Sequence, residues 1–149
     1  MEKEVTEYLR AHYPEIIDMT QYHVPENYEI IDFKKFLIKQ FGQEVHFVDV
    51  DRIALLRTAL INKYQNEKNC FKYFGSIQEV EFSTLSYYQE EVGIRGPKFH
   101  QIDDPVYILQ VENMQILWEG YHRALVKIID GKEIIRGYVL TLQDNINTN

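Results

Sequence analysis

The feature that most constrains the fold of this chain is a series of short, clearly bounded segments between residues 105 and 142. Val106 to Val111 is rich in β-branched residues, and Met114 to Trp118 repeats that character after the two residues Glu112-Asn113. Two such runs separated by a two-residue turn predict a β-hairpin.

A helix and a last strand are expected to follow this hairpin. Gly120 breaks the second strand, and Asp130-Gly131 ends the next segment. Between them, apolar residues recur at helical spacing, at Ala124, Leu125, Ile128 and Ile129. Ile134 to Leu140 is a further β-branched run. This strand–helix–strand succession implies a crossover connection that packs on a sheet.

Three helices are expected in the N-terminal half of the chain. The first covers residues 2–12, ahead of Pro14. Asp32 can cap the second, which ends at Gly42, and Asp51 can cap the third. The third helix carries an apolar stripe at Ile53, Leu56, Leu60 and Tyr64.

The segments between these helices are shorter. Val45 to Val50 alternates like a short strand, and the polar residues 66–76 are expected to be irregular. Residues 80–85 predict a strand or a passage from strand to helix, and residues 87–91 predict a helix. Gly and Pro residues mark a break at 93–98.

Together these segments predict an α+β fold: a small mixed sheet with a helix-rich N-terminal half packed on it. The chain of 149 residues is expected to form a single domain, 1–149, with a helix-rich part at 1–76 and a core at 77–143.

The composition restricts the class of function. A net charge of -7 disfavours nonspecific binding to DNA or RNA. Cys70 is the one cysteine, which excludes an intrachain disulfide and suits a reducing cytoplasm. The charged start of the chain predicts neither a signal peptide nor a membrane span. No two histidines have the spacing of a helical metal site, so no metal centre is expected.

The turn Glu119-Gly120-Tyr121-His122-Arg123 carries the most chemistry. Backbone N–H groups at a helix N-terminus favour a phosphate or carboxylate, and Gly120 would let a ligand approach the backbone closely. Arg123 can grip phosphate oxygens, and His122 can donate to phosphate or move a proton. Glu119 can hold a metal ion, a ribose hydroxyl or a proton. The alternative interpretation is a surface turn that binds nothing.

This turn also carries a family resemblance. Residues 116–125, Ile-Leu-Trp-Glu-Gly-Tyr-His-Arg-Ala-Leu, resemble the signature segment of the ParB/sulfiredoxin superfamily: a β-strand, an acidic residue, then Gly-x-x-Arg or Gly-x-His-Arg opening a helix. Residues 131–140 resemble the return strand of that family, and residues 104–106 resemble the start of the preceding strand. The resemblance extends back to Val80 if residues 80–85 are the first strand.

In that superfamily the signature segment binds nucleotide phosphates. Members include CTP-hydrolysing partition proteins, ATP-using sulfiredoxins and nucleotide-dependent free-serine kinases. The resemblance therefore implies a nucleoside triphosphate, ATP or CTP, with Mg²⁺. Carried over by position, the phosphate-binding residues would be those of the turn, Gly120 to Arg123, with Glu119 in the acidic position. Lys98 and His100 would be accessory phosphate contacts.

The chain departs from the family at several positions. Tyr121 stands where sulfiredoxins have the catalytic cysteine, which argues against sulfinic acid reduction. His122 replaces the second arginine of partition proteins, and the chain ends soon after Leu142, so DNA binding is disfavoured. Kinase-like members have Asp in place of Glu119, and their upstream carboxylate has two candidates here, Glu79 and Glu81.

The expected function is that of a cytoplasmic ParB/sulfiredoxin-like protein that binds a nucleotide or a small phosphorylated ligand. It would be a phosphotransferase or a nucleotide hydrolase, with Glu119 and His122 as catalytic residues. The alternative is a non-enzymatic regulatory protein that uses the same fold to bind a protein partner. A ParB-like nuclease is the least supported class, because the chain is acidic and has no evident metal-binding carboxylate cluster.

Overall fold

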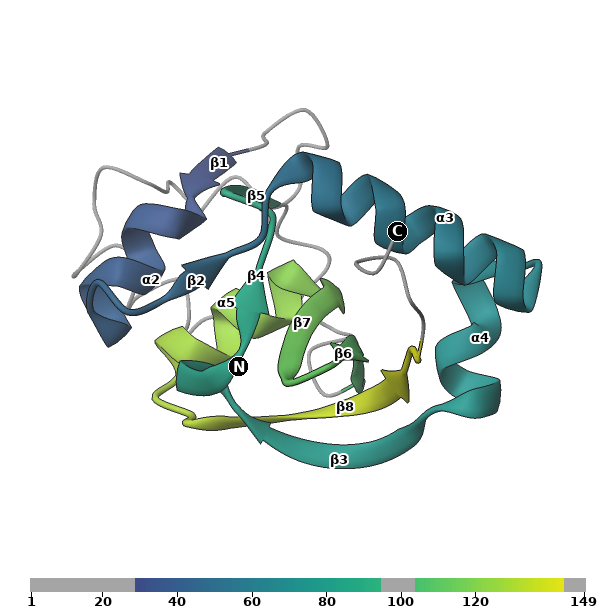
Figure 1. Cartoon of the computed structure of the whole chain (residues 1–149). Coiled ribbons are helices and arrows are strands. Elements are labelled where there is room, and N and C mark those ends of the chain that lie inside the picture. The colour runs from purple at the N-terminus through teal and green to yellow at the C-terminus, as the bar shows by residue number, and fades with distance from the viewer. Residues whose placement is uncertain (1–28, 95–103, 144–149) are drawn as a thin grey trace.

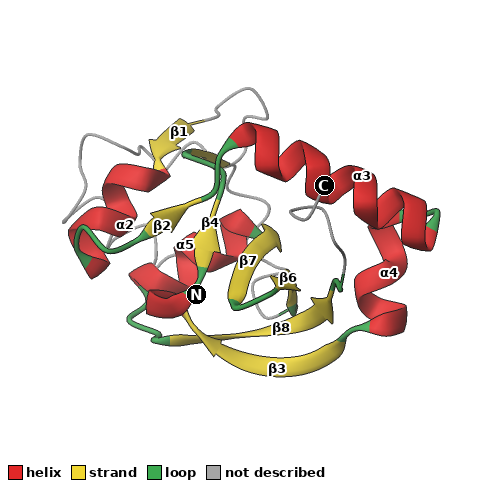
Figure 2. Ribbon diagram, in the orientation of Figure 1, coloured by secondary structure: helices red, strands yellow, loops and turns green. Residues whose placement is uncertain are grey.

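The structure is a computed structural model, which describes residues 29–94 and 104–143. Within these residues lie four α-helices and a six-stranded mixed sheet, so the α+β class is confirmed (Figures 1 and 2). The expected helix at residues 2–12 lies outside the described residues. In chain order the elements are β1 (Glu29–Asp32), α2 (Phe33–Phe41), β2 (His46–Phe47), α3 (Val50–Tyr64), α4 (Glu67–Phe74), β3 (Ser76–Glu81), the 3-10 helix η2 (Phe82–Thr84), β4 (Ser86–Tyr87), β5 (Glu91–Ile94), β6 (Val106–Val111), β7 (Met114–Glu119), α5 (Tyr121–Ile129) and β8 (Ile134–Thr141).

The main sheet has the strand order β2-β4-β7-β6-β8-β3. The strands β2, β4 and β7 are parallel, β6 pairs antiparallel with β7 as the predicted hairpin, and β3 pairs antiparallel with β8. The strands β6 and β8 are parallel neighbours, so the chain between them passes through both β7 and α5. β1 and β5 form a separate antiparallel pair.

Helices cover both faces of the main sheet. One buried cluster joins α2 and α5 to one face, and a second cluster joins α3 and α4 to the other. The alternation in β8 shows the division, because Ile135 and Val139 belong to the first cluster and Leu140 to the second. The central strands are therefore apolar on both faces, as a sheet covered on both sides requires.

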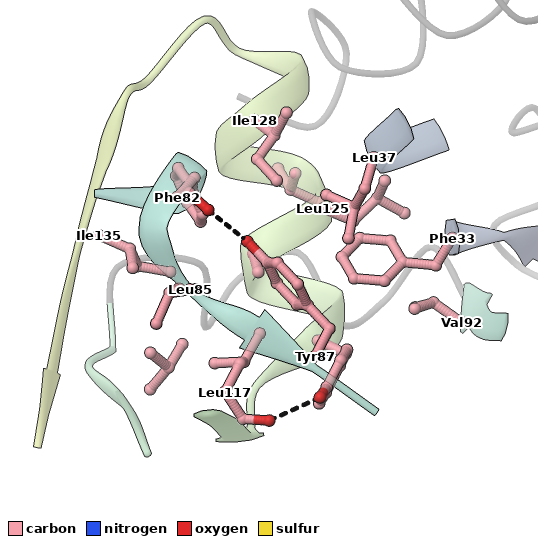
Figure 3. Close-up of a cluster of buried hydrophobic side chains, with 14 of the residues drawn as sticks. Phe33, Leu37, Phe82, Leu85, Tyr87, Val92, Leu117, Leu125, Ile128 and Ile135 are labelled. Carbon is pink, nitrogen blue, oxygen red and sulfur yellow. Dashed lines mark hydrogen bonds between the residues drawn. The ribbon is translucent and has the colours of Figure 1, made fainter. Parts of the chain in front are cut away.

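The first cluster holds α5 in place (Figure 3). Phe33 of α2 lies edge-on to Tyr87, with ring centroids 5.6 Å apart, and Leu125 of α5 is completely buried in the same cluster. The Tyr87 hydroxyl donates to the Phe82 carbonyl at 2.9 Å, so this buried polar group is satisfied. Burial of each such large side chain contributes about 1.5–3 kcal/mol.

The helix ends test the capping predictions. Asp32 caps α2 by accepting from the Lys35 N–H, and Gly42 follows the helix at φ +88°, as predicted. The prediction for the next helix was wrong: Asp49 caps α3, accepting from the Arg52 N–H at 2.8 Å. Asp51 instead lies in the first turn of α3, where a carboxylate is favourable to the helix dipole.

Three segments differ from the prediction. Residues 45–50 were expected to be one short strand, but β2 covers His46–Phe47 and Val50 already begins α3. Residues 66–76 were expected to be irregular but contain α4, on which Cys70 and Phe71 are buried. Residues 87–91 form no helix, since Tyr87 pairs in the sheet and Glu91 begins β5. In the described part of the chain, no helix has the length and apolar character needed to cross a membrane.

Candidate functional site

The C-terminal ends of the parallel strands β4 and β7 lie side by side, and we call this row of strand ends one edge of the sheet. Ser86 of β4 pairs with Ile116 of β7, so the residues that follow each strand emerge together. The Tyr88 hydroxyl donates to the Trp118 carbonyl at 2.8 Å, which ties the two strand ends to each other. β6 begins at the same edge, where Tyr107 pairs with Glu119. Strand ends of this kind are a common position for ligand sites in α/β sheets.

The predicted turn lines a pocket of about 370 Å³ at this edge, which we call the α5 pocket. All five residues from Glu119 to Arg123 line it, and Gln89, Val92 and Gly93 complete the wall. The structure thus brings the predicted turn together with β5 and the residues just before it, which the sequence analysis did not associate with the turn.

Gly120 is required by the protein itself. It is the N-cap of α5 at φ +109°, and a Cβ atom there would lie 2.5 Å from Cγ1 of Val106. The space beside the α-carbon is therefore filled by a strand of the core. We expected that the missing Cβ of Gly120 would let a ligand approach the backbone. Val106 occupies that position instead.

Tyr121 is largely built into the core. It is 4% exposed, and its hydroxyl donates to the Leu117 carbonyl at 2.6 Å while accepting from the Tyr88 N–H at 3.0 Å. Burial raises the pKa of this hydroxyl above its usual value. The phenol group therefore connects β7, α5 and the end of β4, and the remainder of the residue contributes to the pocket wall.

Arg123 bridges the turn and the start of β6. Its Nη1 donates to the carbonyl oxygens of Asp104 and Pro105, at 3.3 and 3.0 Å. These bonds explain how a cation is tolerated in the first turn of a helix, where the dipole opposes it. Within the described residues both bonds use Nη1, so Nη2 and Nε are the donors that remain to face a ligand.

The other predicted site residues are distributed differently. His122 is half-buried in the wall of the α5 pocket, and Glu119 is exposed at its rim. Glu79 and Glu81 lie on β3, three strands away from β7, and Glu79 lines a different pocket. Lys98 and His100 lie outside the described residues.

A second and larger pocket, of about 650 Å³, adjoins the first, and we call it the aromatic pocket. Gln89 and Glu119 line both pockets. The remaining walls come from α3, α4 and the sheet, and they include the half-buried Tyr88 and Tyr107 and the buried Phe71 and Trp118. Sequence analysis missed this pocket, because Trp118 and the residues of α3 and α4 carried no local sign that they would meet.

Three side chains form a connected group in the aromatic pocket. Trp118 Nε1 donates to Glu67 Oε1 at 2.6 Å, and Arg57 Nε lies 3.3 Å from the same oxygen. The guanidinium of Arg57 also lies 5.3 Å from the centre of the Trp118 ring, a cation–π distance. The indole, the carboxylate and the guanidinium therefore hold one another in fixed positions.

The described residues contain no group of three or more His, Cys, Asp or Glu side chains placed to hold a metal ion. Among the described residues that line the α5 pocket, Glu119 is the one with a carboxylate. Mg²⁺ commonly binds through one or two carboxylates together with the phosphates of a substrate, so a single carboxylate is compatible with that mode of binding.

Comparisons of this chain with protein-family models, with curated proteins and with solved structures found no match.

Proposed function

We propose that this protein binds a nucleotide or another small phosphorylated ligand, with the phosphate in the α5 pocket. The observation that supports the proposal most is that Glu119 to Arg123 line one pocket at the N-terminus of α5, whose cap is a glycine. Because Gly120 has no side chain, it cannot cap the first-turn N–H groups, and a phosphate oxygen can accept from them.

Arg123 and His122 would supply the remaining contacts. The bonds from Arg123 to two backbone carbonyls fix its guanidinium beside the turn before any ligand arrives. A pre-positioned donor loses less conformational entropy on binding. The proposed phosphate site agrees with the resemblance of residues 116–125 to the ParB/sulfiredoxin signature. We propose that this chain belongs to that superfamily.

Glu119 determines whether the site needs a cation. Its exposed carboxylate stands at the rim of the pocket. A phosphate bound in the same pocket and this carboxylate repel each other unless a metal ion or a proton lies between them. If the ligand is a nucleoside triphosphate with Mg²⁺, Glu119 would be the protein group that holds the ion, while the phosphates supply the other ligands.

Calorimetry tests the proposal directly. ATP, CTP, GTP and inorganic tripolyphosphate should each be titrated into the protein with and without Mg²⁺. We expect tripolyphosphate and at least one nucleotide to bind. Absence of heat with all four, in both conditions and at millimolar concentrations, would contradict the proposed function.

A charge placed at the rim provides a matched variant. Gln89→Glu adds a negative charge to the wall of the α5 pocket, whereas Gln78→Glu adds the same charge on the exposed edge strand β3. One unit charge near a phosphate costs about 1 kcal/mol in water, or roughly a fivefold loss of affinity. We expect that loss for Gln89→Glu alone. An equal effect of the two variants would place the anion elsewhere.

The second candidate is a non-enzymatic protein that binds an anion or a protein partner through the same turn. Two observations favour it: Gly120 is explained by its packing on Val106, and Arg123 by its bonds to the start of β6. Glu119→Gln separates the two candidates. In an enzyme it should abolish phosphate release or transfer while nucleotide still binds. In a simple binder, wild type shows no turnover and the variant binds tripolyphosphate equally well or more tightly.

A further inference from the structure

We propose that the aromatic pocket receives the planar ring of the same ligand, so that the preferred ligand is a nucleotide and not a simple phosphate ester. This inference rests on the proposed function, since it takes the α5 pocket as the phosphate site. It adds a subsite made by α3, α4 and the sheet, to which the signature segment contributes Trp118 and Glu119.

The relation between the two pockets sets the shape of the ligand. Gln89 and Glu119 line both pockets, so these two side chains stand at the boundary between them. A ligand that occupies both pockets would pass over this boundary with its middle part. In a nucleotide that part is the sugar, and the Gln89 amide is a suitable partner for its hydroxyl groups, while the Glu119 carboxylate stays available to Mg²⁺.

The walls of the aromatic pocket suit a flat ring. Phe71 and Tyr107 stack with their ring planes at 4° and their centroids 5.2 Å apart, which holds Tyr107 in a fixed orientation. The ring centroids of Tyr88 and Trp118 lie 5.7 Å apart. The Tyr88 hydroxyl donates a hydrogen bond to the Trp118 carbonyl, which restricts rotation of the Tyr88 side chain. Phe71 and Trp118 are buried, so the half-buried rings of Tyr88 and Tyr107 are the ones that offer stacking surface to a ligand. Rings of fixed orientation do so at little entropic cost, and base–aromatic stacking contributes about 1–3 kcal/mol per base.

The polar groups of the pocket suit the edge of a nucleobase. Trp118 and Arg57 both contact Oε1 of Glu67, so within the described residues Oε2 is the oxygen that can accept from an N–H of a ligand. Glu67 is only partly exposed, with 26% of its side chain accessible. A partly buried acceptor next to a guanidinium provides one acceptor and one donor side by side, as the edge of a base requires.

The chain contains one tryptophan, Trp118, so tryptophan fluorescence reports on the surroundings of this one residue, which lines the aromatic pocket. The full-length protein should be titrated with ATP, GTP, CTP, adenosine and tripolyphosphate, with excitation selective for tryptophan. Free N-acetyltryptophanamide corrects for absorption by the bases. We expect at least one nucleotide to change the emission with saturation, and tripolyphosphate to leave the emission unchanged while it still binds by calorimetry.

A pair of arginines on α3 provides matched variants. Arg57→Gln removes the guanidinium beside Trp118, whereas Arg52→Gln makes the same change on the same helix, at a residue paired with Glu112 outside the pocket. A lost cation–π contact and edge donor should weaken nucleotide binding by about three- to thirtyfold. Tripolyphosphate affinity should stay the same in both variants.

The outcomes separate the two proposals. Nucleotides that bind no more tightly than tripolyphosphate, with no change in Trp118 emission, overturn the ring subsite and leave the phosphate site standing. Saturable quenching by adenosine without binding of tripolyphosphate supports the ring subsite and overturns the phosphate site. Absence of binding by all five compounds overturns both. The comparison uses wild type, so it does not depend on whether a variant folds.

Discussion

The side chain of Val106 occupies the space that a Cβ atom on residue 120 would need. A Cβ atom there would lie 2.5 Å from Cγ1 and 2.8 Å from Cβ of Val106, and 3.2 Å from Nη2 of Arg123. The turn before α5 is thus fixed between the first residue of β6 and an arginine side chain. Any ligand held by the turn is therefore held by a rigid part of the core.

Gly120→Ala should be strongly destabilising. A left-handed backbone costs a non-glycine residue about 1–2 kcal/mol, and overpacking adds about 1–3 kcal/mol. Gly131→Ala is the control, because Gly131 also has a positive φ, +83°, but nothing lies within 4 Å of its Cβ position. Urea denaturation should show the larger loss at residue 120. Val106→Ala, combined with Gly120→Ala, should recover part of the lost stability. Equal losses of stability at both glycines would mean that Val106 does not restrict the turn.

Leu125→Ala should cost about 2–5 kcal/mol, because a completely buried leucine leaves a cavity between α5 and the sheet. Leu55→Ala is the matched control, since 53% of Leu55 on α3 is exposed. Its removal should cost less than about 1 kcal/mol. Chemical denaturation of both variants gives the comparison. A loss below about 0.5 kcal/mol for Leu125→Ala would show that the buried face of α5 has been assigned wrongly.

Most of the fold around α5 could be predicted, because local patterns determine it. The hairpin, the apolar face of α5 and the strand β8 are each predicted by a pattern within a short stretch of sequence. The cap of α3 could not be chosen in the same way. Asp49 and Asp51 are both suitable residue types, and only the folded backbone decides which carboxylate reaches the Arg52 N–H.

The pockets depend on contacts between distant parts of the chain. Glu67 contacts Trp118 across 51 residues, and it lies on α4, in a segment that the sequence analysis expected to be irregular. Gln89 joins the α5 pocket because β4 pairs with β7, a pairing that no local pattern reveals. The turn itself could be predicted, since Gly120 breaks the strand β7 and the helical spacing of apolar residues begins soon after it.

Arg123→Ala should lower stability by about 1–3 kcal/mol, since it removes the two bonds from a charged donor to the Asp104 and Pro105 carbonyls. Arg123→Lys should lose part of this, because one ammonium nitrogen can donate to both carbonyl oxygens, as Nη1 does, but lacks the rigid planar group that places Nη1 between them. Arg136→Ala, at an exposed position of β8, should change stability by less than about 0.5 kcal/mol. Full recovery by lysine in denaturant melts would mean that only the charge of Arg123 matters.

Tyr87 and Tyr121 should make the protein less stable in alkali. Burial raises the pKa of both phenols, so above about pH 10 the unfolded chain loses protons that the folded protein keeps. The free energy of unfolding should then fall with pH, by up to about 1.4 kcal/mol per pH unit for each tyrosine. Tyr121→Phe should reduce this slope, although its lost hydrogen bonds lower stability near neutral pH by about 1–3 kcal/mol. Tyr73→Phe is the control, because Tyr73 is 79% exposed. Urea melts across this pH range decide the question, and a wild-type slope in Tyr121→Phe would exclude Tyr121 as a source of the alkaline loss.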